Sequence, residues 1–282
     1  MVIPDAVVFT GNISEAASGK DILLFAVPSV FVRATARQAA PYVENGQVIV
    51  DVAKGIEPGT LLTMTEIIGE EMGKQGKGDV KLVALSGPTH AEEVAKDLPT
   101  TIVSASCDAR AAAYVQDVFM NTCLRVYTNR DTRGVELCGA MKNIIALASG
   151  ISAGLGYGDN TKAALITRGM AEITRLGLAM GCMAETFYGL AGIGDLIVTA
   201  TSVHSRNNRA GYLIGQGRTA EEARQEVGMV VEGINALPAA MELSARYHVE
   251  MPLCRAVNEI VNEGASPRET VRRLMERPRK GE

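Results

Sequence analysis

One long apolar stretch limits what this chain of 282 residues can fold into. Leu137–Gly158 contains a single charged side chain, Lys142, and Asn143 follows it. The stretch has the length of a membrane span, but the lysine, the asparagine and five glycines favour a buried core helix that runs into a turn. A lysine in such a helix snorkels to the surface, pairs with a carboxylate, or serves as a base near neutral pH because burial lowers its pKa.

Composition narrows the class of protein. A hydrophobic fraction of 47% supports a large core, and 282 residues suffice for about two domains. The net charge of −4, without a basic block, argues against nucleic acid as the main partner. Five cysteines without a CxxC pair predict reduced thiols in a cytoplasmic protein, and their spacing and that of the three histidines predict no metal site. The first fifteen residues lack the basic segment of a signal peptide.

The first half alternates short apolar runs with helical patterns. The apolar runs are Ala6–Thr10, Ile22–Val27, Val48–Val52, Lys81–Leu85 and, more weakly, Thr101–Ser104 and Leu124–Tyr127. The helical patterns are Ile13–Ala17, Val30–Val43, Leu61–Gly73, Ala91–Lys96 and Asp108–Met120. Apolar runs between amphipathic helices predict a mainly parallel sheet covered on both faces, which is a doubly wound fold. Such folds bind ligands at the carboxyl ends of their strands.

Three of the predicted strands end in residues suited to a site. The segments that follow them are Pro28-Ser29, Ala53–Glu57 and Ser86–Ala91. Gly87 permits a close approach of the backbone to a ligand, and Thr89 is suited to cap the next helix. Any one segment is also explained as an ordinary βα turn, but three at one edge of a sheet favour a binding site.

The second half has no convincing strand from about Asp131 onward. Its helical patterns are Thr132–Ile151, Asn160–Met180, Met229–Tyr247, Pro252–Glu263 and Pro267–Arg277. We therefore predict an α/β domain over residues 1–130 and an all-α domain over residues 131–282.

Three polar segments stand out in the helical half. They are Lys142-Asn143, Gly192–Leu196, in which glycines flank Asp195, and Ser205–Arg209. Arginine beside the free amides of a helix N-terminus forms a good phosphate site. A solvated helix start at Ser205–Arg209 and a simple capping role for Asp195 are the alternatives, and the residues alone leave both open.

These segments and several others closely resemble the bacterial NAD(P)-dependent glycerol-3-phosphate dehydrogenase family. The resemblance covers nearly all of the chain, and it includes the segments Ala53–Glu57, Ser86–Ala95, Met141–Asn143, Gly156–Asn160, Ala163–Gly169, Gly192–Leu196, Ser205–Asn207 and Val231–Gly233. It implies a Rossmann-type domain, mainly parallel, followed by an all-α domain. The family interconverts sn-glycerol 3-phosphate and glycerone phosphate with NAD or NADP. It supplies glycerol 3-phosphate for phospholipid synthesis and tends to be homodimeric.

The resemblance also implies a role for each matching residue. Lys142 is the proton acceptor in the oxidation, and burial together with the charge of Lys54 would lower its pKa. The substrate residues, besides Lys142, are Lys54, Gly87, Thr89, Asp195, Ser205, Arg206 and Asn207. The cofactor residues are Lys54, Ala91, Arg206, Val230 and Glu232. Thr89 stands where many members have serine, which also carries a hydroxyl.

The chain departs from the family before Ala6–Thr10. Members open with a strand and a glycine-rich turn that holds the cofactor pyrophosphate, and nothing like it precedes that run. We therefore expect an incomplete Rossmann-type domain without two βα units, roughly 50–60 residues at about 30 per unit. The strand that distinguishes NAD from NADP is among them, and Ile22–Val27 is expected to be an exposed edge.

Three functions remain open from the sequence. The leading hypothesis is a cytoplasmic, homodimeric glycerol-3-phosphate dehydrogenase without a membrane span. The second is a non-catalytic phosphate-binding or dimerising form of the same family, which the missing glycine-rich turn suggests. The third is a related two-domain dehydrogenase for another small hydroxy acid, because Ser205–Asn207 would also accept a sulfate or a carboxylate.

Overall fold

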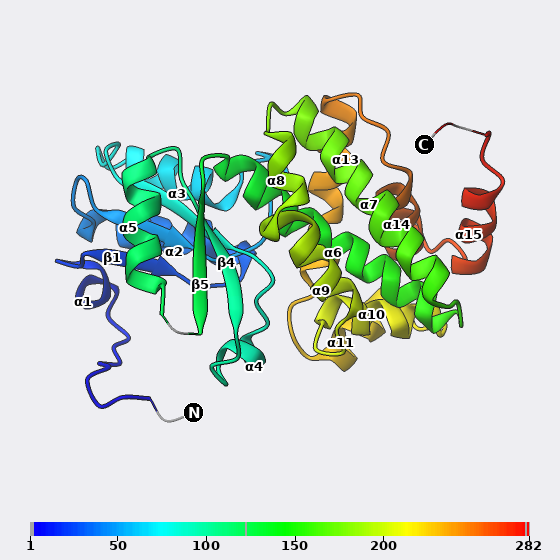
Figure 1. Ribbon diagram of the computed structural model, residues 1–282, viewed down its shortest axis with the longest axis horizontal. Coiled ribbons are helices and arrows are strands. Elements are labelled where there is room, and N and C mark those ends of the chain that lie inside the picture. The colour runs from blue at the N-terminus through cyan, green and yellow to red at the C-terminus, as the bar shows by residue number, and fades with distance from the viewer. Residues whose placement is uncertain (1–2, 122, 280, 282) are drawn as a thin grey trace.

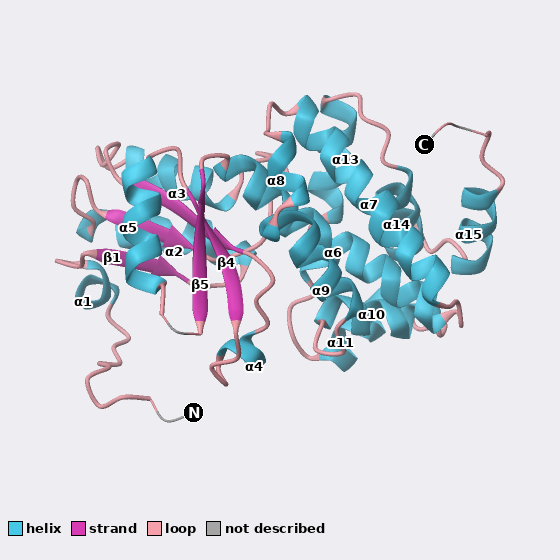
Figure 2. Ribbon diagram, viewed as in Figure 1, coloured by secondary structure: helices cyan, strands magenta, loops and turns pink. Residues whose placement is uncertain are grey.

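Strands and helices divide the chain in two. The computed structural model describes residues 3–121, 123–279 and 281. Among these residues, every strand precedes residue 130 and only helices follow (Figure 1, Figure 2). The strands are β1 (Ile22–Phe25), β2 (Val48–Asp51), β3 (Lys81–Ser86), β4 (Thr100–Ala105) and β5 (Leu124–Asn129). The helices of this half are α1 (Ile13–Ala17), η1 (Ser29–Phe31), α2 (Val32–Ala39), η2 (Ala40–Tyr42), α3 (Met64–Gly73), α4 (Ala91–Val94) and α5 (Ala109–Phe119).

The five strands form one sheet in the order β1-β2-β3-β4-β5. β1, β2 and β3 run parallel, β4 is antiparallel to β3, and β5 runs parallel to β4. The predicted mainly parallel, Rossmann-like sheet is therefore confirmed. Because β1, β2 and β3 point the same way, the three segments that follow them lie at one edge of the sheet, as expected.

Apolar layers cover both faces of the sheet. One layer joins Phe25 and Ile49 of the sheet to buried residues of α1, α2 and α3. The other joins Val50 and Val83 to Val115 of α5. Figure 1 shows α5 in front of the strands and α2 and α3 behind them. Side chains of neighbouring positions in a strand point to opposite faces, so the continuous apolar runs serve both layers.

The strand predicted over Ala6–Thr10 does not form. These residues are irregular, and Val8 and Phe9 are 84% and 76% exposed. Figure 1 shows the segment running away from the sheet. A strand needs a neighbour that completes its hydrogen bonds and covers one face, and a β-rich composition does not provide one. By contrast, β1 is the outermost strand of the described sheet, which confirms the predicted exposed edge.

The second half packs helices around one central helix. Its elements are α6 (Thr132–Gly154), α7 (Asp159–Ala179), α8 (Ala184–Tyr188), η3 (Leu190–Gly194), α9 (Asp195–Thr201), α10 (Arg206–Gly215), α11 (Ala220–Val227), α12 (Glu232–Asn235), α13 (Leu237–Arg246), α14 (Pro252–Asn262) and α15 (Pro267–Met275). The helix expected over Met229–Tyr247 is divided into α12 and α13. Pro238 in the first turn of α13 explains the break, since proline lacks the amide that continues a helix.

The apolar stretch forms α6, the core of this half. The carboxylate of Asp131 accepts a hydrogen bond from the amide of Gly134 and caps its start, and Gly156 follows its end with a φ of +87°. α6 is long and apolar enough to cross a membrane, but 89% of its most apolar window is buried inside the protein. It contacts α7, α9, α10, α12 and α14. The core-helix interpretation of the sequence is therefore confirmed.

Four glycines bring α6 and α10 into backbone contact. They are Gly150 and Gly154 on α6, and Gly211 and Gly215 on α10. A Cβ at Gly150 would lie 2.0 Å from a carbonyl oxygen of α10, and one at Gly211 would lie 2.1 Å from a carbonyl oxygen of α6. No side chain fits between the two helices here. The crossing therefore fixes the N-terminus of α10 relative to the polar residues of α6.

Candidate active site

A cavity of about 650 Å³ lies between the carboxyl ends of β1, β2 and β3 and the helices α6, α9, α10 and α12. Of the residues singled out from the sequence, Gly87 alone does not line it. Those that do are Lys54, Thr89, Ala91, Lys142, Asp195, Ser205, Arg206, Asn207, Val230 and Glu232. Residues from six separate segments of the chain thus meet at one place.

Lys142 is buried at the floor of this cavity. Its Nζ lies 2.5 Å from Oδ1 of Asp195 and donates to Oγ1 of Thr199 at 2.6 Å. The side chain is 5% exposed, so it pairs with a carboxylate and does not snorkel. Burial, and next the charge of Lys54, lower the pKa of Lys142 to about 7, while Asp195 opposes them. A pKa of about 7 makes both the neutral amine and the ammonium form of Lys142 accessible near neutral pH.

Asp195 joins two lysines from the two halves of the chain. Lys54 Nζ lies 2.6 Å from Oδ2 of Asp195 and donates to the carbonyl of Gly87 at 3.1 Å. Burial alone would raise the pKa of Asp195, but the ammonium groups of Lys54 and Lys142 hold it below its usual value. The carboxylate is therefore charged at neutral pH. Its contacts with both lysines go beyond a capping role.

The sequence did not single out Thr199, although it is in contact with Lys142. Its hydroxyl accepts from Lys142 Nζ and donates to the backbone carbonyl of Asp195 at 2.7 Å. Thr199 follows Asp195 by four positions on α9, so both side chains lie on one face of the helix. The four-residue spacing from Asp195 is therefore the sequence feature that could have identified Thr199.

The N-terminus of α10 presents a cation and two polar side chains. Ser205 caps the helix by accepting from the amide of Asn208 at 3.2 Å. Within the described residues, Arg206 forms no ion pair, which leaves its guanidinium available to an anion. Asn207 is buried, donates to Oδ1 of Asn143 at 2.9 Å and accepts from the amide of Gly233 at 2.8 Å. Asn207 therefore ties α10 to α6 and α12.

The segment after β3 is organised differently from the prediction. Thr89 does not cap α4, whose N-cap is His90, and its hydroxyl donates to the carbonyl of Gly87 at 3.2 Å. A Cβ at Gly87 would lie 3.1 Å from the Cα of Ile102 on β4. The glycine therefore serves the close packing of two strands, and its carbonyl holds Lys54.

Glu232 closes the cavity from the helical half. Its carboxylate accepts hydrogen bonds from the amide and the hydroxyl of Ser29, at 3.2 and 2.7 Å. Ser29 lies just after β1, in one of the three segments predicted to meet at the sheet edge. Glu232 and Val230 thus line the cavity from the helical half, while Lys54 and Ala91 line it from the sheet half.

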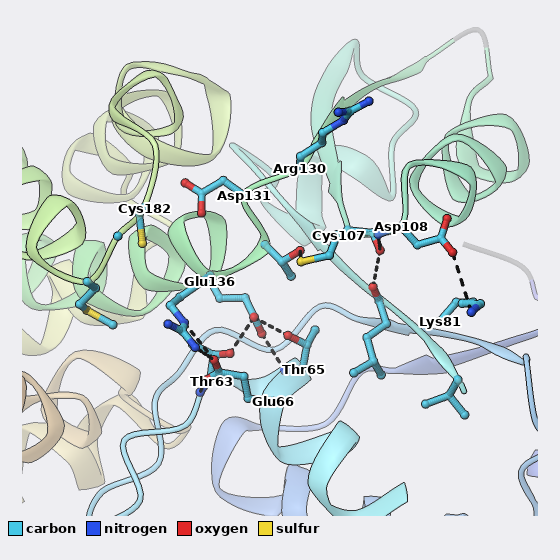
Figure 3. Close-up of a pocket in the computed structure, with 17 residues that line it drawn as sticks. Thr63, Thr65, Glu66, Lys81, Cys107, Asp108, Arg130, Asp131, Glu136 and Cys182 are labelled. Carbon is cyan, nitrogen blue, oxygen red and sulfur yellow. Dashed lines mark hydrogen bonds and ion pairs between the residues drawn. The ribbon is translucent and has the colours of Figure 1, made fainter. Parts of the chain in front are cut away.

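A second cavity of about 510 Å³ lies elsewhere on the junction of the two halves (Figure 3). Figure 3 shows the carboxylate of Glu136 between Thr63 and Thr65, with Cys107 and Cys182 farther away. None of the residues singled out from the sequence lines this cavity. Some of its charged groups pair with each other, as Arg133 does with Glu66. The first cavity is therefore the candidate active site.

Comparisons with known proteins agree with this geometry. Residues 1–112 match the family model for the NAD-dependent glycerol-3-phosphate dehydrogenase N-terminus, and residues 131–272 match that for the C-terminus. A relative from Lactobacillus delbrueckii subsp. bulgaricus, named glycerol-3-phosphate dehydrogenase [NAD(P)+] 2, is 68% identical over 283 positions, which span 100% of this chain and 84% of the relative. One from Agathobacter rectalis with the same enzyme name is 52% identical over 99% of this chain and 81% of its own length.

Solved structures give the same picture. The glycerol-3-phosphate dehydrogenase of Coxiella burnetii superposes with a TM-score of 0.91 at 36% identity, covering 97% of this chain and 82% of that one. The enzyme of Saccharomyces cerevisiae gives a TM-score of 0.82 at 27% identity, covering 97% and 81%.

Proposed function

Because this chain belongs to the NAD-dependent glycerol-3-phosphate dehydrogenase family, we propose that it interconverts sn-glycerol 3-phosphate and glycerone phosphate as an NAD(P)-dependent oxidoreductase. The observation that carries the proposal is the buried Lys142, held by Asp195 and Thr199 in a cavity that also contains Arg206, which forms no ion pair with the residues that the structure describes. A base at the floor and a cation at the wall match a substrate with a hydroxyl and a phosphate.

Lys142 moves the proton in this reaction. In the oxidation, neutral Lys142 accepts the proton of the C2 hydroxyl, and a pKa of about 7 makes the neutral amine abundant under neutral conditions. In the reduction, charged Lys142 donates a proton to the ketone oxygen and stabilises the developing alkoxide. Asp195 and Thr199 orient the ammonium group, since each holds it through a short contact.

Arg206 positions the substrate through its phosphate. The guanidinium stands at the first residue of α10, where the free amides of the helix also favour an anion. A phosphate held there places C2 next to Lys142 without entering the reaction, and this positioning lowers the barrier. We assign Ser205, Asn207 and Thr89 to the same substrate site, and Gly87 to it indirectly, through the carbonyl that holds Lys54.

The residues present fit the nicotinamide part of a dinucleotide. Lys54, Ala91, Arg206, Val230 and Glu232 line one continuous cavity along the carboxyl ends of the parallel strands, where such folds bind dinucleotides. When bound, NAD(P) accepts the hydride from C2 in the oxidation and returns it in the reduction. Lys54, with its ammonium group beside Asp195, is suited to contact both substrate and nicotinamide.

Family membership supports three further assignments, which we propose together. The protein is a homodimer, it acts in the cytoplasm, and its product glycerol 3-phosphate enters phospholipid synthesis.

The test is an assay of the purified protein for oxidation of NADH and NADPH that depends on glycerone phosphate. We expect turnover with the phosphorylated ketone and little with its unphosphorylated analogue dihydroxyacetone. Arg206→Met should raise the KM for glycerone phosphate about a hundredfold, as loss of a charged anchor predicts. Arg218→Met, at a surface position between α10 and α11, is the matched control. Equal rates with and without the phosphate on the substrate would refute the proposal.

A further inference from the structure

The contacts around the candidate active site form a closed ring. From Lys142 the ring passes to Asp195 and then to Lys54, through ion pairs of 2.5 and 2.6 Å. From the neighbouring Gly55 it passes to Ser29, and from Ser29 to Glu232 through two hydrogen bonds. The ring closes through Gly233, Asn207 and Asn143, the residue after Lys142. It crosses between the sheet half and the helical half twice.

The two crossings are of different kinds. Lys54 and Asp195 meet as opposite charges on the side of the cavity that holds Lys142. Ser29 and Glu232 meet through a neutral hydroxyl, a backbone amide and a carboxylate, on the side lined by Pro28 and Val230. The first crossing contains residues assigned to the reaction. The second has no residue next to Lys142, so its loss leaves the proton-transfer residues in place.

Ser29 is also held from the side of the sheet. A Cβ on Gly55 would lie 2.4 Å from the Cβ of Ser29, so the backbone next to Lys54 packs directly on the serine. Its amide and hydroxyl then point to one carboxylate, at 3.2 and 2.7 Å. Because Ser29 is packed against the sheet edge and makes two hydrogen bonds to Glu232, it fixes the position of α12 relative to that edge.

We propose that Ser29 is a positioning residue: by binding Glu232 across the junction, it sets the width of the cavity on the dinucleotide side. This inference rests on the proposed function. Ser29 acts through Glu232 and does not contact the reacting atoms. Its loss therefore weakens dinucleotide binding and leaves the chemical step and the affinity for glycerone phosphate nearly unchanged.

Kinetics of the full chain test this role. Ser29→Ala removes the hydroxyl donor to a carboxylate, and we expect a rise of about tenfold in the KM for NADH. The kcat and the KM for glycerone phosphate should stay within twofold. Ser29→Thr keeps the hydroxyl and should restore the KM for NADH, and Ser18→Ala, an exposed serine near α1, should change nothing. Equal losses in all three kinetic constants would overturn the proposal.

Two further variants isolate the contact itself. Glu232→Gln combined with Ser29→Ala should be no worse than the poorer single variant, because both remove the same interaction. Gly55→Ala should displace Ser29 and reproduce the selective rise in the KM for NADH. Additive effects of Ser29→Ala and Glu232→Gln would show that the two residues act separately.

Hydrogen exchange provides a readout that does not depend on catalysis. In the protein without ligands, Ser29→Ala should raise amide exchange by severalfold in both Ser29–Phe31 and Glu232–Asn235, and leave α13 unchanged. If the unaltered protein shows neither turnover nor NADH binding, the proposed function fails while this measurement still decides the role of Ser29. Unchanged exchange in Glu232–Asn235 would overturn the role whatever the kinetics show.

Discussion

Two buried ionisable groups on α6 have similar pKa values and opposite uses. Lys142 and Glu136 are each 5% exposed, and burial brings both pKa values to about 7, downward for the lysine and upward for the glutamate. Six positions separate them, which turns them to different sides of the helix. Lys142 faces the candidate active site, whereas Glu136 faces the second cavity.

Their partners explain the difference. Lys142 contacts the charged Asp195 and the hydroxyl of Thr199 at a wall open to a ligand. Glu136 accepts from both hydroxyls and the backbone amide at the start of α3: Thr63 Oγ1 at 2.8 Å, Thr65 Oγ1 at 2.5 Å and Thr65 N at 2.8 Å. Burial thus sets the pKa of each group. The partners leave one group, Lys142, placed for the proposed proton exchange with a ligand, while the other fastens the helical half to the sheet half.

The largest effect should separate the two groups by activity. Lys142→Met should lower kcat about 10²–10⁴-fold, because it removes the proton acceptor. Glu136→Gln should retain kcat within a few fold, since it lies outside the active-site cavity. Steady-state assays with glycerone phosphate and NADH measure both. Comparable activity losses in the two variants would remove the functional distinction.

Stability should show the reverse order. Glu136→Ala leaves three buried donors around Thr63 and Thr65 without an acceptor, and we expect a loss of about 3 kcal/mol in the free energy of unfolding. Glu136→Gln keeps an acceptor and should cost about 1 kcal/mol. Lys142→Met should change the free energy by less than about 1 kcal/mol, because Asp195 keeps its ion pair with Lys54. Urea unfolding measures all three, and a Lys142→Met variant less stable than Glu136→Ala would contradict the comparison.

Asp51, at the end of β2, shows what burial does to a carboxyl that has no good hydrogen-bond partner in the described part of the chain. Burial, and next the charge of the nearby Glu136, raise its pKa to about 8, although the Ala53 amide acts in the opposite direction. Among the described residues, neither carboxylate oxygen has a hydrogen-bond partner of ordinary geometry. At pH 8 the buried carboxyl must either hold its proton against the solvent or carry a buried charge, and both cost folding free energy. Asp51→Asn should therefore stabilise the protein by about 2 kcal/mol at pH 8. Thermal unfolding of the two proteins at pH 5 and pH 8 measures this, and a gain that shrinks with rising pH would contradict it.

The last effect is a pair of opposite pH slopes, each limited to about 1.4 kcal/mol per pH unit for one group. The pKa of Glu136 is about 7 in the folded protein and 4.5 in the unfolded chain. Its contribution to the free energy of unfolding therefore falls as the pH rises from 4.5 to 7. The pKa of Lys142 is about 7 in the folded protein and 10.5 in the unfolded chain. Its contribution to the free energy of unfolding therefore rises as the pH rises from 7 to 10.5. Glu136→Gln should remove the pH dependence of the free energy of unfolding between pH 4.5 and 7, and Lys142→Met should remove it between pH 7 and 10.5. If both variants removed it in the same pH range, the two groups would not be distinct.

The sequence predicted residues that carry a local signal. Lys142 was visible as the lone charge of an apolar stretch, and the strand ends that gather around it follow from a parallel sheet. Glycines flanking a lone acid pointed to Asp195. In each case a few neighbouring residues were sufficient to identify the site residue. The fold class then predicts where the ends of the strands meet.

Residues defined by a distant partner could not be predicted. Glu136 stands just before the apolar stretch and looks like any polar residue at a helix start, since its partners are about seventy positions away. Ser29 meets Glu232 across an even longer separation. Ala6–Thr10 failed for the same reason, because its composition suits a strand but no neighbouring strand covers it. Two pairs of glycines spaced by four were in view on α6 and α10, but nothing local says that they cross.

That glycine crossing has a consequence for substrate choice. With no side chains between α6 and α10 at this crossing, the two main chains meet directly, so backbone contact sets how the helix start that bears Arg206 lies relative to Lys142. A molecule anchored by its phosphate at one end of this span brings one particular carbon to the base. Under the proposed function, a substrate with one more methylene between the phosphate and the hydroxyl should therefore present the wrong atom to Lys142, so that backbone geometry selects the chain length.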